Sequence, residues 1–188
     1  MVRPVVTPIA FDELPAALAD LLRPRYERLG YLGAFFQCAA HQPDALAGWV
    51  AFSEAAKGGL PDNLSELIGL TAAKVLENPY EANQHERLAV RLGLGRNWVA
   101  DVENLEPDRA KLTPAERLVQ RYVLAALSAR TPGGDTTSLV DELVNEMGVP
   151  GAVAVILLTA RFLAHSLVVH SLGVEPPVPS IWEDGFGA

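Results

Sequence analysis

The spacing of apolar residues along the chain is helical almost throughout. Strand-like alternating runs joined by Asn-Gly or Asp-Gly turns are absent from the sequence. Gly- and Pro-containing breaks separate the periodic segments, as at GGLPDN (58–63), and TPGGDT (131–136) is expected to be the clearest flexible loop. The pattern predicts an all-α protein. Its expected helices are 12–29, 33–40, 43–57, 63–77, 79–92, 97–105, 114–129, 137–147 and 150–172.

Two segments carry clear signals of a helix start. Thr113, Pro114 and Glu116 place a cap, a first-turn proline and a third-position glutamate in order, which is a strong start signal. Asp12 is the expected cap of the first helix, and Pro24 is expected to disturb that helix.

No long linker or low-complexity block divides the chain. We therefore expect one helical domain over residues 1–188, with 1–30 as an N-terminal helical arm and 174–188 as a C-terminal tail. The tail is rich in Pro and Gly, and we expect it to wrap the surface of the protein or a neighbouring subunit.

The most apolar stretch, residues 151–173, is predicted to be a buried core or interface helix. Arg161, His165 and His170 interrupt it, and its longest uninterrupted part, 152–160, is far shorter than the roughly 20 residues of a membrane span. Both histidines are expected to be buried or interfacial polar groups. The N-terminal segment lacks an uninterrupted apolar run typical of a signal peptide. We expect a cytoplasmic protein without a membrane partner.

Composition narrows the possible functions. The formal net charge is −8, and the arginines are scattered, which argues against nucleic acid as a partner. There is one cysteine, Cys38, so neither an intramolecular disulfide nor a Cys-rich metal site is possible. Cys38 lies in the apolar segment FFQCAA and is expected to be a small buried hydrophobe.

The strongest functional signal lies around ENPYEANQH (77–85). Glu81 and His85 are four residues apart and share a helix face, while Glu66 lies on the preceding helix. There is also a purely structural interpretation. Asn78 and Glu81 have the spacing of a capping box, and Asn63 and Glu66 repeat that spacing one helix earlier.

The register E-x11-N-x2-E-x3-H resembles the carboxymuconolactone decarboxylase and alkylhydroperoxidase D-like family, whose peroxidase branch carries E-x11-C-x2-C-x3-H. The segments 35–49 (FFQCAAHQPDALAGW), 112–129 and 166–177 extend the resemblance over most of residues 28–177. The resemblance implies an alkylhydroperoxidase D-like helical bundle. It also implies self-association, as a trimer or hexamer or else a dimer.

Asn78 and Glu81 occupy the two positions at which the peroxidase branch has its thiols. A thiol peroxidase cycle is therefore not expected. Cysteine-free members of the family typically have a Tyr-Glu pair four residues before the histidine, as Tyr80, Glu81 and His85 do here.

The remaining groups predict acid–base chemistry without a cofactor. His85 titrates near neutral pH, and Glu81 or Glu66 would orient its ring and stabilise its charge. Tyr80 and Asn78 would bind the substrate through their hydroxyl and amide groups, and Arg87 would bind a substrate carboxylate. The predicted function is a carboxymuconolactone decarboxylase-like lyase or isomerase that acts on a small carboxylated, lactone or carbonyl substrate.

Two alternatives stay open at this point. The protein could be a non-catalytic binding or scaffolding oligomer in which Glu66 and Glu81 are only helix caps. It could also be a metal-dependent enzyme in which Glu66, Glu81 and His85 are the ligands.

Overall fold

The computed structural model describes residues 6–128 and 135–187. Within these residues the chain is helical and contains no strand, which confirms the predicted all-α class. The elements are η1 (Phe11–Glu13), α1 (Ala16–Leu29), α2 (Ala34–Ala39), α3 (Pro43–Gly58), α4 (Asp62–Val75), α5 (Pro79–Arg91), α6 (Arg96–Glu103), α7 (Pro114–Ser128), α8 (Thr137–Leu172) and α9 (Ile181–Asp184).

Most predicted helices are confirmed to within two residues at the ends that the structure describes, and the first one differs most. It begins at Ala16, with Pro15 rather than Asp12 at the cap position. The helix also continues through Pro24, so the expected disturbance there is not a break. The predicted loop at 131–136 lies mostly outside the described residues.

Helix α8 is interrupted at Gly148, where φ is 74° and ψ is 168°. A positive φ of this kind is readily adopted only by glycine. The break separates the two helical parts that the sequence predicts, and Pro150 begins the second.

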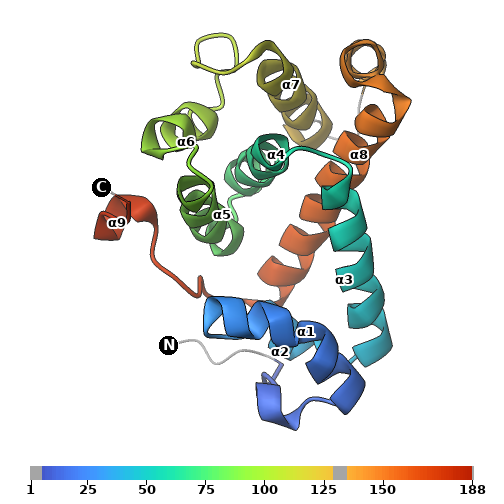
Figure 1. The fold of residues 1–188 in the computed structure, drawn as a ribbon, viewed down its shortest axis with the longest axis vertical. Helices are drawn as coiled ribbons and strands as arrows, with labels where there is room; N and C mark the ends of the chain where they lie inside the picture. Colours follow the sequence, from blue (N-terminus) through green and yellow to red (C-terminus); the bar gives the residue numbers. More distant parts are fainter. Residues whose placement is uncertain (1–5, 129–134, 188) are drawn as a thin grey trace.

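Helix α4 is the centre of the fold (Figure 1). It packs against α5, α7 and α8, and the side chains of Leu67, Ile68 and Leu70 are completely buried. A second apolar cluster lies among α1, α2 and α3 and includes Leu22, Phe35 and Leu46. The two clusters meet along α5 and α8, where polar side chains lie between them.

The tail folds back over α5 and α6 of its own chain. Buried Glu86 accepts hydrogen bonds from the Ser180 hydroxyl at 2.6 Å and from the Ile181 amide at 2.9 Å. Trp182 donates to Glu103 at 2.8 Å. These contacts fix the short helix α9 against the outer side of α5.

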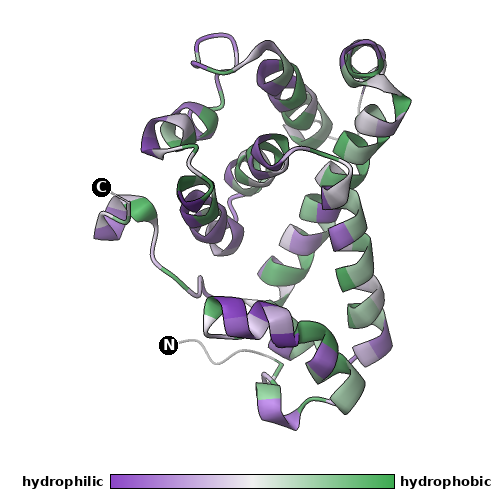
Figure 2. Ribbon diagram, in the orientation of Figure 1, coloured by the Kyte–Doolittle hydropathy of each residue, from purple (hydrophilic) through white to green (hydrophobic). Residues whose placement is uncertain are grey.

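The part of α8 that follows Gly148 is largely apolar (Figure 2). By length and composition the helix could cross a membrane, with a mean hydropathy of 2.1 over 18 residues. However, 56% of that window is buried inside the protein. This is the usual behaviour of a core helix, which passes the same hydropathy test.

Gly69 allows α4 to approach α5 and α8 closely. A Cβ atom at this position would lie 2.9 Å from Cζ of Phe162 and 3.0 Å from Cε1 and Nδ1 of His85. The side chain of His85 therefore rests directly on the backbone of α4.

We predict that Gly69→Ala lowers the free energy of unfolding by about 1–3 kcal/mol, because the added methyl overpacks this contact. Gly48→Ala in α3 is the matched control, since a Cβ there meets nothing within 4 Å. That variant should be neutral or gain up to about 1 kcal/mol from helix propensity. Denaturant unfolding measures both, and equal effects would contradict the packing account.

Candidate active site

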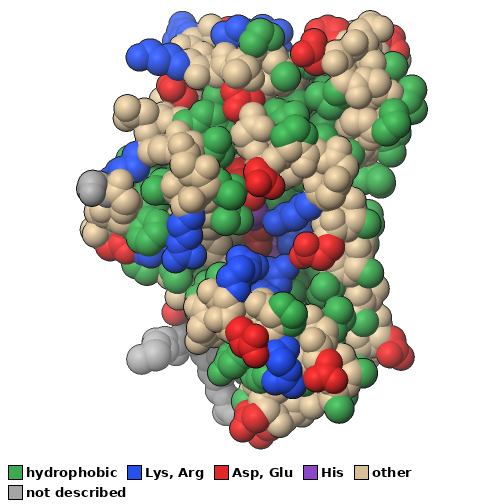
Figure 3. Space-filling view, in the orientation of Figure 1, with side chains coloured by type: hydrophobic (Ala, Val, Ile, Leu, Met, Phe, Trp, Pro, Cys, Tyr) green, Lys and Arg blue, Asp and Glu red, His purple; other side chains and the backbone are tan. Residues whose placement is uncertain are grey.

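A pocket opens between α1, α3, α5 and α8, and Figure 3 shows it as a hollow rimmed by Lys and Arg side chains. Its volume is about 260 Å³, near the lower end of the range for small-molecule sites. Tyr80 and Val178 contribute to its wall, as do His85 and His165.

The pocket is strongly basic although the whole chain is acidic. Six cationic side chains line it, against two carboxylates. The cations are Arg25, Arg28, Lys57, Arg87, Arg91 and Arg161, and the carboxylates are Glu54 and Glu81. Such a concentration of positive charge attracts anionic ligands.

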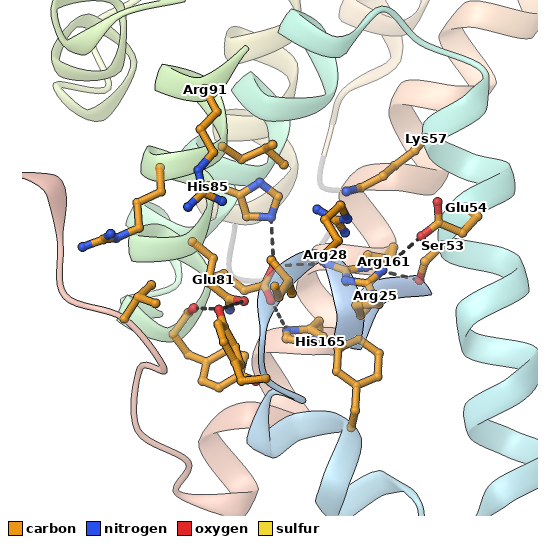
Figure 4. A pocket seen from close by; sticks show the side chains of 18 residues that line it. Arg25, Arg28, Ser53, Glu54, Lys57, Glu81, His85, Arg91, Arg161 and His165 are labelled. Carbon is orange, nitrogen blue, oxygen red and sulfur yellow. Dashed lines mark hydrogen bonds and ion pairs between the residues drawn. The ribbon is translucent and has the colours of Figure 1, made fainter. Parts of the chain in front are cut away.

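His85 is held between two carboxylates (Figure 4 shows the contact with Glu81). Its Nδ1 lies 2.6 Å from Oε2 of Glu66, and its Nε2 lies 3.1 Å from Oε2 of Glu81. An ionised carboxylate only accepts hydrogen bonds, so each nitrogen must carry a proton for both bonds to form. The arrangement therefore favours the imidazolium form.

The pKa of His85 agrees with this geometry. Burial of the ring works against its positive charge and is the largest single influence. The charges and hydrogen bonds of Glu66 and Glu81 together outweigh burial and raise the pKa to about 8. His85 is thus protonated at neutral pH.

The carboxylate of Glu81 contacts three other buried ionisable side chains. Its Oε2 also accepts a hydrogen bond from Arg161 at 3.2 Å, and its Oε1 lies 3.1 Å from Nδ1 of His165. Burial opposes ionisation of Glu81, but His165, Arg161 and His85 lower its pKa well below the ordinary value. Glu81 is an anion under all physiological conditions.

His165 does not contribute a charge at neutral pH. Burial chiefly lowers its pKa to about 4, although Glu81 opposes that shift. The centroid of its ring lies 4.1 Å from that of the Phe35 ring and 6.1 Å from that of the Trp49 ring. Nδ1 approaches Glu81 without the geometry of a hydrogen bond, so the atom has no such partner. Above about pH 4, Arg161 and His85 are therefore the cations that balance Glu81.

The structure brings Glu66, Glu81 and His85 together as the sequence predicts, although Glu66 lies behind the ring and does not line the pocket. The interpretation of both glutamates as caps is wrong. Asn78 does accept a hydrogen bond from the Glu81 amide at 3.2 Å, but the carboxylate of Glu81 turns to His85 instead of returning it. Asn63 lies inside α4 and donates to Glu116 of α7.

The three expected substrate-binding residues lie in different surroundings. Tyr80 lines the pocket, and its hydroxyl accepts a hydrogen bond from the Phe35 amide at 3.2 Å. Arg87 also lines it, but its guanidinium is held by Asp184 and by the Pro179 carbonyl. The substrate-binding roles of Tyr80 and Arg87 stay predictions.

Asn78 does not line the pocket. It is 1% exposed, and its amide donates to the Ser166 hydroxyl at 2.8 Å while its oxygen caps α5. This placement does not support the expected contact with substrate. Instead, Asn78 ties α5 to α8 and so positions Glu81.

Arg161 and Lys57 are pocket residues that the sequence analysis does not identify as functional. A signal for Arg161 is present, because Arg161 and His165 are ionisable residues four apart within the most apolar stretch of the chain. Two such residues on one face of a core helix need a buried partner, and Glu81 provides it. No comparable signal marks Lys57.

The site does not have the geometry of a metal centre. Glu66 and Glu81 contact opposite edges of the His85 ring and do not converge on one point. In the part of the chain that the structure describes, no three His, Cys, Asp or Glu side chains are placed to hold a metal ion. The arrangement offers a protonated imidazole, with a cationic cavity in front of it.

Cys38 lies away from the pocket, in α2. It is buried, and its Sγ is 3.7 Å from the carbonyl oxygen of Val6. Burial raises the pKa of the thiol, which is the reverse of what a nucleophilic cysteine needs.

We predict that Arg161→Met lowers the free energy of unfolding by about 3–5 kcal/mol, because it removes a buried partner of the Glu81 carboxylate. Arg25→Met is the matched control in the same pocket, where the side chains of the pair with Glu54 are 27% and 61% exposed and the pair is worth about 1 kcal/mol or less. Urea unfolding at neutral pH measures both. A loss for Arg161→Met no larger than that of the control would contradict the assigned role of Glu81.

Comparison with solved structures supports the fold. A peroxidase-related protein of uncharacterised function from Ralstonia eutropha JMP134, with an alkylhydroperoxidase AhpD core, is 18% identical, with a TM-score of 0.76. The match covers 98% of this chain and 94% of that one.

The debrominase Bmp8 without ligand is also 18% identical, with a TM-score of 0.74 and 95% of each chain covered. A cysteine-to-alanine variant of Bmp8 in complex with 2,3,4-tribromopyrrole is 17% identical, with a TM-score of 0.70 over 93% of this chain and 92% of that one.

No curated protein matches the chain. The model of the carboxymuconolactone decarboxylase family does match, over residues 43–106, which contain Glu66, Glu81 and His85. The match confirms the resemblance seen in the sequence for this segment: residues 43–106 are similar to the carboxymuconolactone decarboxylase family, here without the Cys-x-x-Cys pair, and the fold of the chain is that of the alkylhydroperoxidase AhpD core.

Proposed function

We propose that this protein is a cofactor-independent acid–base enzyme, a carboxymuconolactone decarboxylase-like lyase or isomerase. Its substrate is a small carboxylate that also carries a lactone or carbonyl group. The observation that supports this most is the protonated His85, held by Glu66 and Glu81 at the wall of a cationic pocket.

Substrate binding rests on the charge of the pocket. Arg28 and Arg91 have no ion pair in the described part of the chain, so they are available to a substrate carboxylate. Arg161, in contrast, is already paired with Glu81. An anionic substrate would therefore be held near the mouth of the pocket, with its reacting carbon directed towards His85.

The proton step follows from the state of His85. In a decarboxylation, the C–C bond to the carboxylate breaks, carbon dioxide leaves, and the electron pair passes into the neighbouring carbonyl as an enolate. The Nε2–H group of His85, which is hydrogen-bonded to Glu81, supplies the proton that the substrate carbon then takes up. Glu66 holds Nδ1 and keeps the ring in place. In an isomerisation, the same nitrogen would first give its proton to the substrate, and the neutral nitrogen left behind would then remove a proton from another carbon.

Thiol chemistry does not suit this site. Asn78 and Glu81 stand where the peroxidase branch has cysteines, and the lone Cys38 is buried outside the pocket. The likeness to a debrominase, at 18% identity, shows the fold alone, so we do not propose that activity here.

Self-association and a cytoplasmic location are also proposed. Val149, Val153 and Leu157 are spaced four apart on α8 and are 60%, 44% and 42% exposed. An exposed apolar stripe of this kind supports contact with a second copy of the chain.

We predict that His85→Gln lowers the rate about 10²–10⁴-fold, the usual contribution of a positioned proton donor. Release of carbon dioxide from a panel of small 3-oxo acids and carboxylated lactones provides the assay. The wild-type rate should fall as the pH rises through about 8, because His85 then loses its proton.

Cys38→Ala is the control and should keep full activity, with circular dichroism to verify the fold of both variants. Full activity of a folded His85→Gln protein would contradict the proposal. A loss of activity confined to Cys38→Ala would contradict it as well.

A further inference from the structure

Lys57 lies in the last turn of α3, and its side chain extends into the pocket (Figure 4). It comes from the opposite side to α5, and its ammonium group points across the cavity towards the wall that carries His85. The acid–base chemistry proposed above gives no task to this amine.

Lys57 differs from Arg25 and Arg161, two other cations of the pocket, in having no partner. Arg25 pairs with Glu54, and Arg161 pairs with Glu81. In the described residues, the Lys57 ammonium forms no ion pair and no hydrogen bond. An amine that is partly buried but not tied to a carboxylate is free to react.

The surroundings of Lys57 disfavour its charge. Burial lowers its pKa, Glu66 opposes this, and Arg161 lowers the pKa further. Glu54 and Glu81 oppose the shift more weakly. Desolvation next to another cation is how proteins obtain a neutral, nucleophilic lysine near neutral pH.

We propose that Lys57 is an amine nucleophile that forms a Schiff base with the carbonyl group of the substrate. The proposal relies on the proposed function only for the substrate class, a small 3-oxo acid. It adds a covalent step to a site in which His85 is the proton donor.

The covalent step balances without a further reagent. Neutral Nζ of Lys57 adds to the carbonyl carbon, and one proton passes from the nitrogen to the oxygen. A second proton from solvent at the pocket mouth converts the hydroxyl to water, which leaves as the iminium forms. When the C–C bond breaks and carbon dioxide leaves, the electron pair passes into the iminium to give an enamine. His85 protonates the enamine carbon, and water then hydrolyses the iminium, releasing the ketone and the free amine.

This role explains the position of Lys57 better than anion binding alone. Arg28 and Arg91 already provide unpaired cations for a carboxylate. An ammonium kept only for attraction gains nothing from burial, because desolvation weakens its charge. A nucleophile does gain, since each unit by which its pKa falls gives about ten times more neutral amine.

Borohydride trapping tests the proposal in the intact protein. Wild-type protein is incubated at pH 7 with acetoacetate, reduced with sodium borohydride, digested and examined by mass spectrometry, with acetone at the same concentration as a reference. The chain has only three lysines, so Lys74 and Lys111, both exposed, are internal controls. We expect alkylation of Lys57 at least about tenfold above that of Lys74 or Lys111.

Lys57→Arg keeps the positive charge and should lose the adduct, while Lys74→Arg should retain it on Lys57. Equal labelling of all three lysines, or no adduct on Lys57, would overturn the proposal. The proposed function fails separately, if His85→Gln keeps full activity, whatever the trapping result. If acetone formed the adduct on Lys57 as readily as acetoacetate, the pocket would not select the acid. That result would also count against the proposed role of Lys57.

Discussion

The contact on which the site depends is that of the His85 ring with Glu66 on one edge and Glu81 on the other. It holds the two carboxylates apart, fixes the orientation of the ring and keeps it protonated. It also requires α4 and α5 to lie close together, which Gly69 permits by leaving space for the ring against its backbone. The chemistry and the helix packing are therefore parts of one constraint.

Buried charges of this kind are stable only as a balanced group. Glu81 would be costly to bury alone, and Arg161 reaches it from α8, eighty residues away in the sequence. Asn78 adds a hydrogen bond from α5 to Ser166 of the same helix. The polar layer thus joins the two apolar clusters of the fold while presenting His85 and Glu81 to the pocket.

The sequence predicts the helices well, and it also predicts the central triad of Glu66, Glu81 and His85. Both predictions follow from the spacing of residues along the chain. The capping signals show where such reasoning fails. Asn63, Asn78 and Thr113 are each followed by a glutamate at the third position, but only Thr113 and Glu116 exchange the two bonds of a capping box. Glu66 and Glu81 are drawn instead to a buried histidine, a partner that local spacing does not reveal.

Arg161 and Lys57 could not be assigned in the same way. Their partners and surroundings come from helices far away in the chain, and their positions depend on how α3 and α8 cross α5. Periodicity indicates which face of a helix is buried but not what lies opposite that face. The pocket is therefore a property of the tertiary structure, even though the triad can be found from a motif.

The most direct test of the central claim is an NMR titration of the His85 ring nitrogens. We expect a pKa of about 8, with both nitrogens protonated at pH 7. In Glu66→Gln the pKa should fall towards the ordinary value near 6.5, whereas Glu54→Gln, in the same pocket but on Arg25, should leave it unchanged. A wild-type pKa at or below 6.5, or one insensitive to Glu66→Gln, would contradict the account.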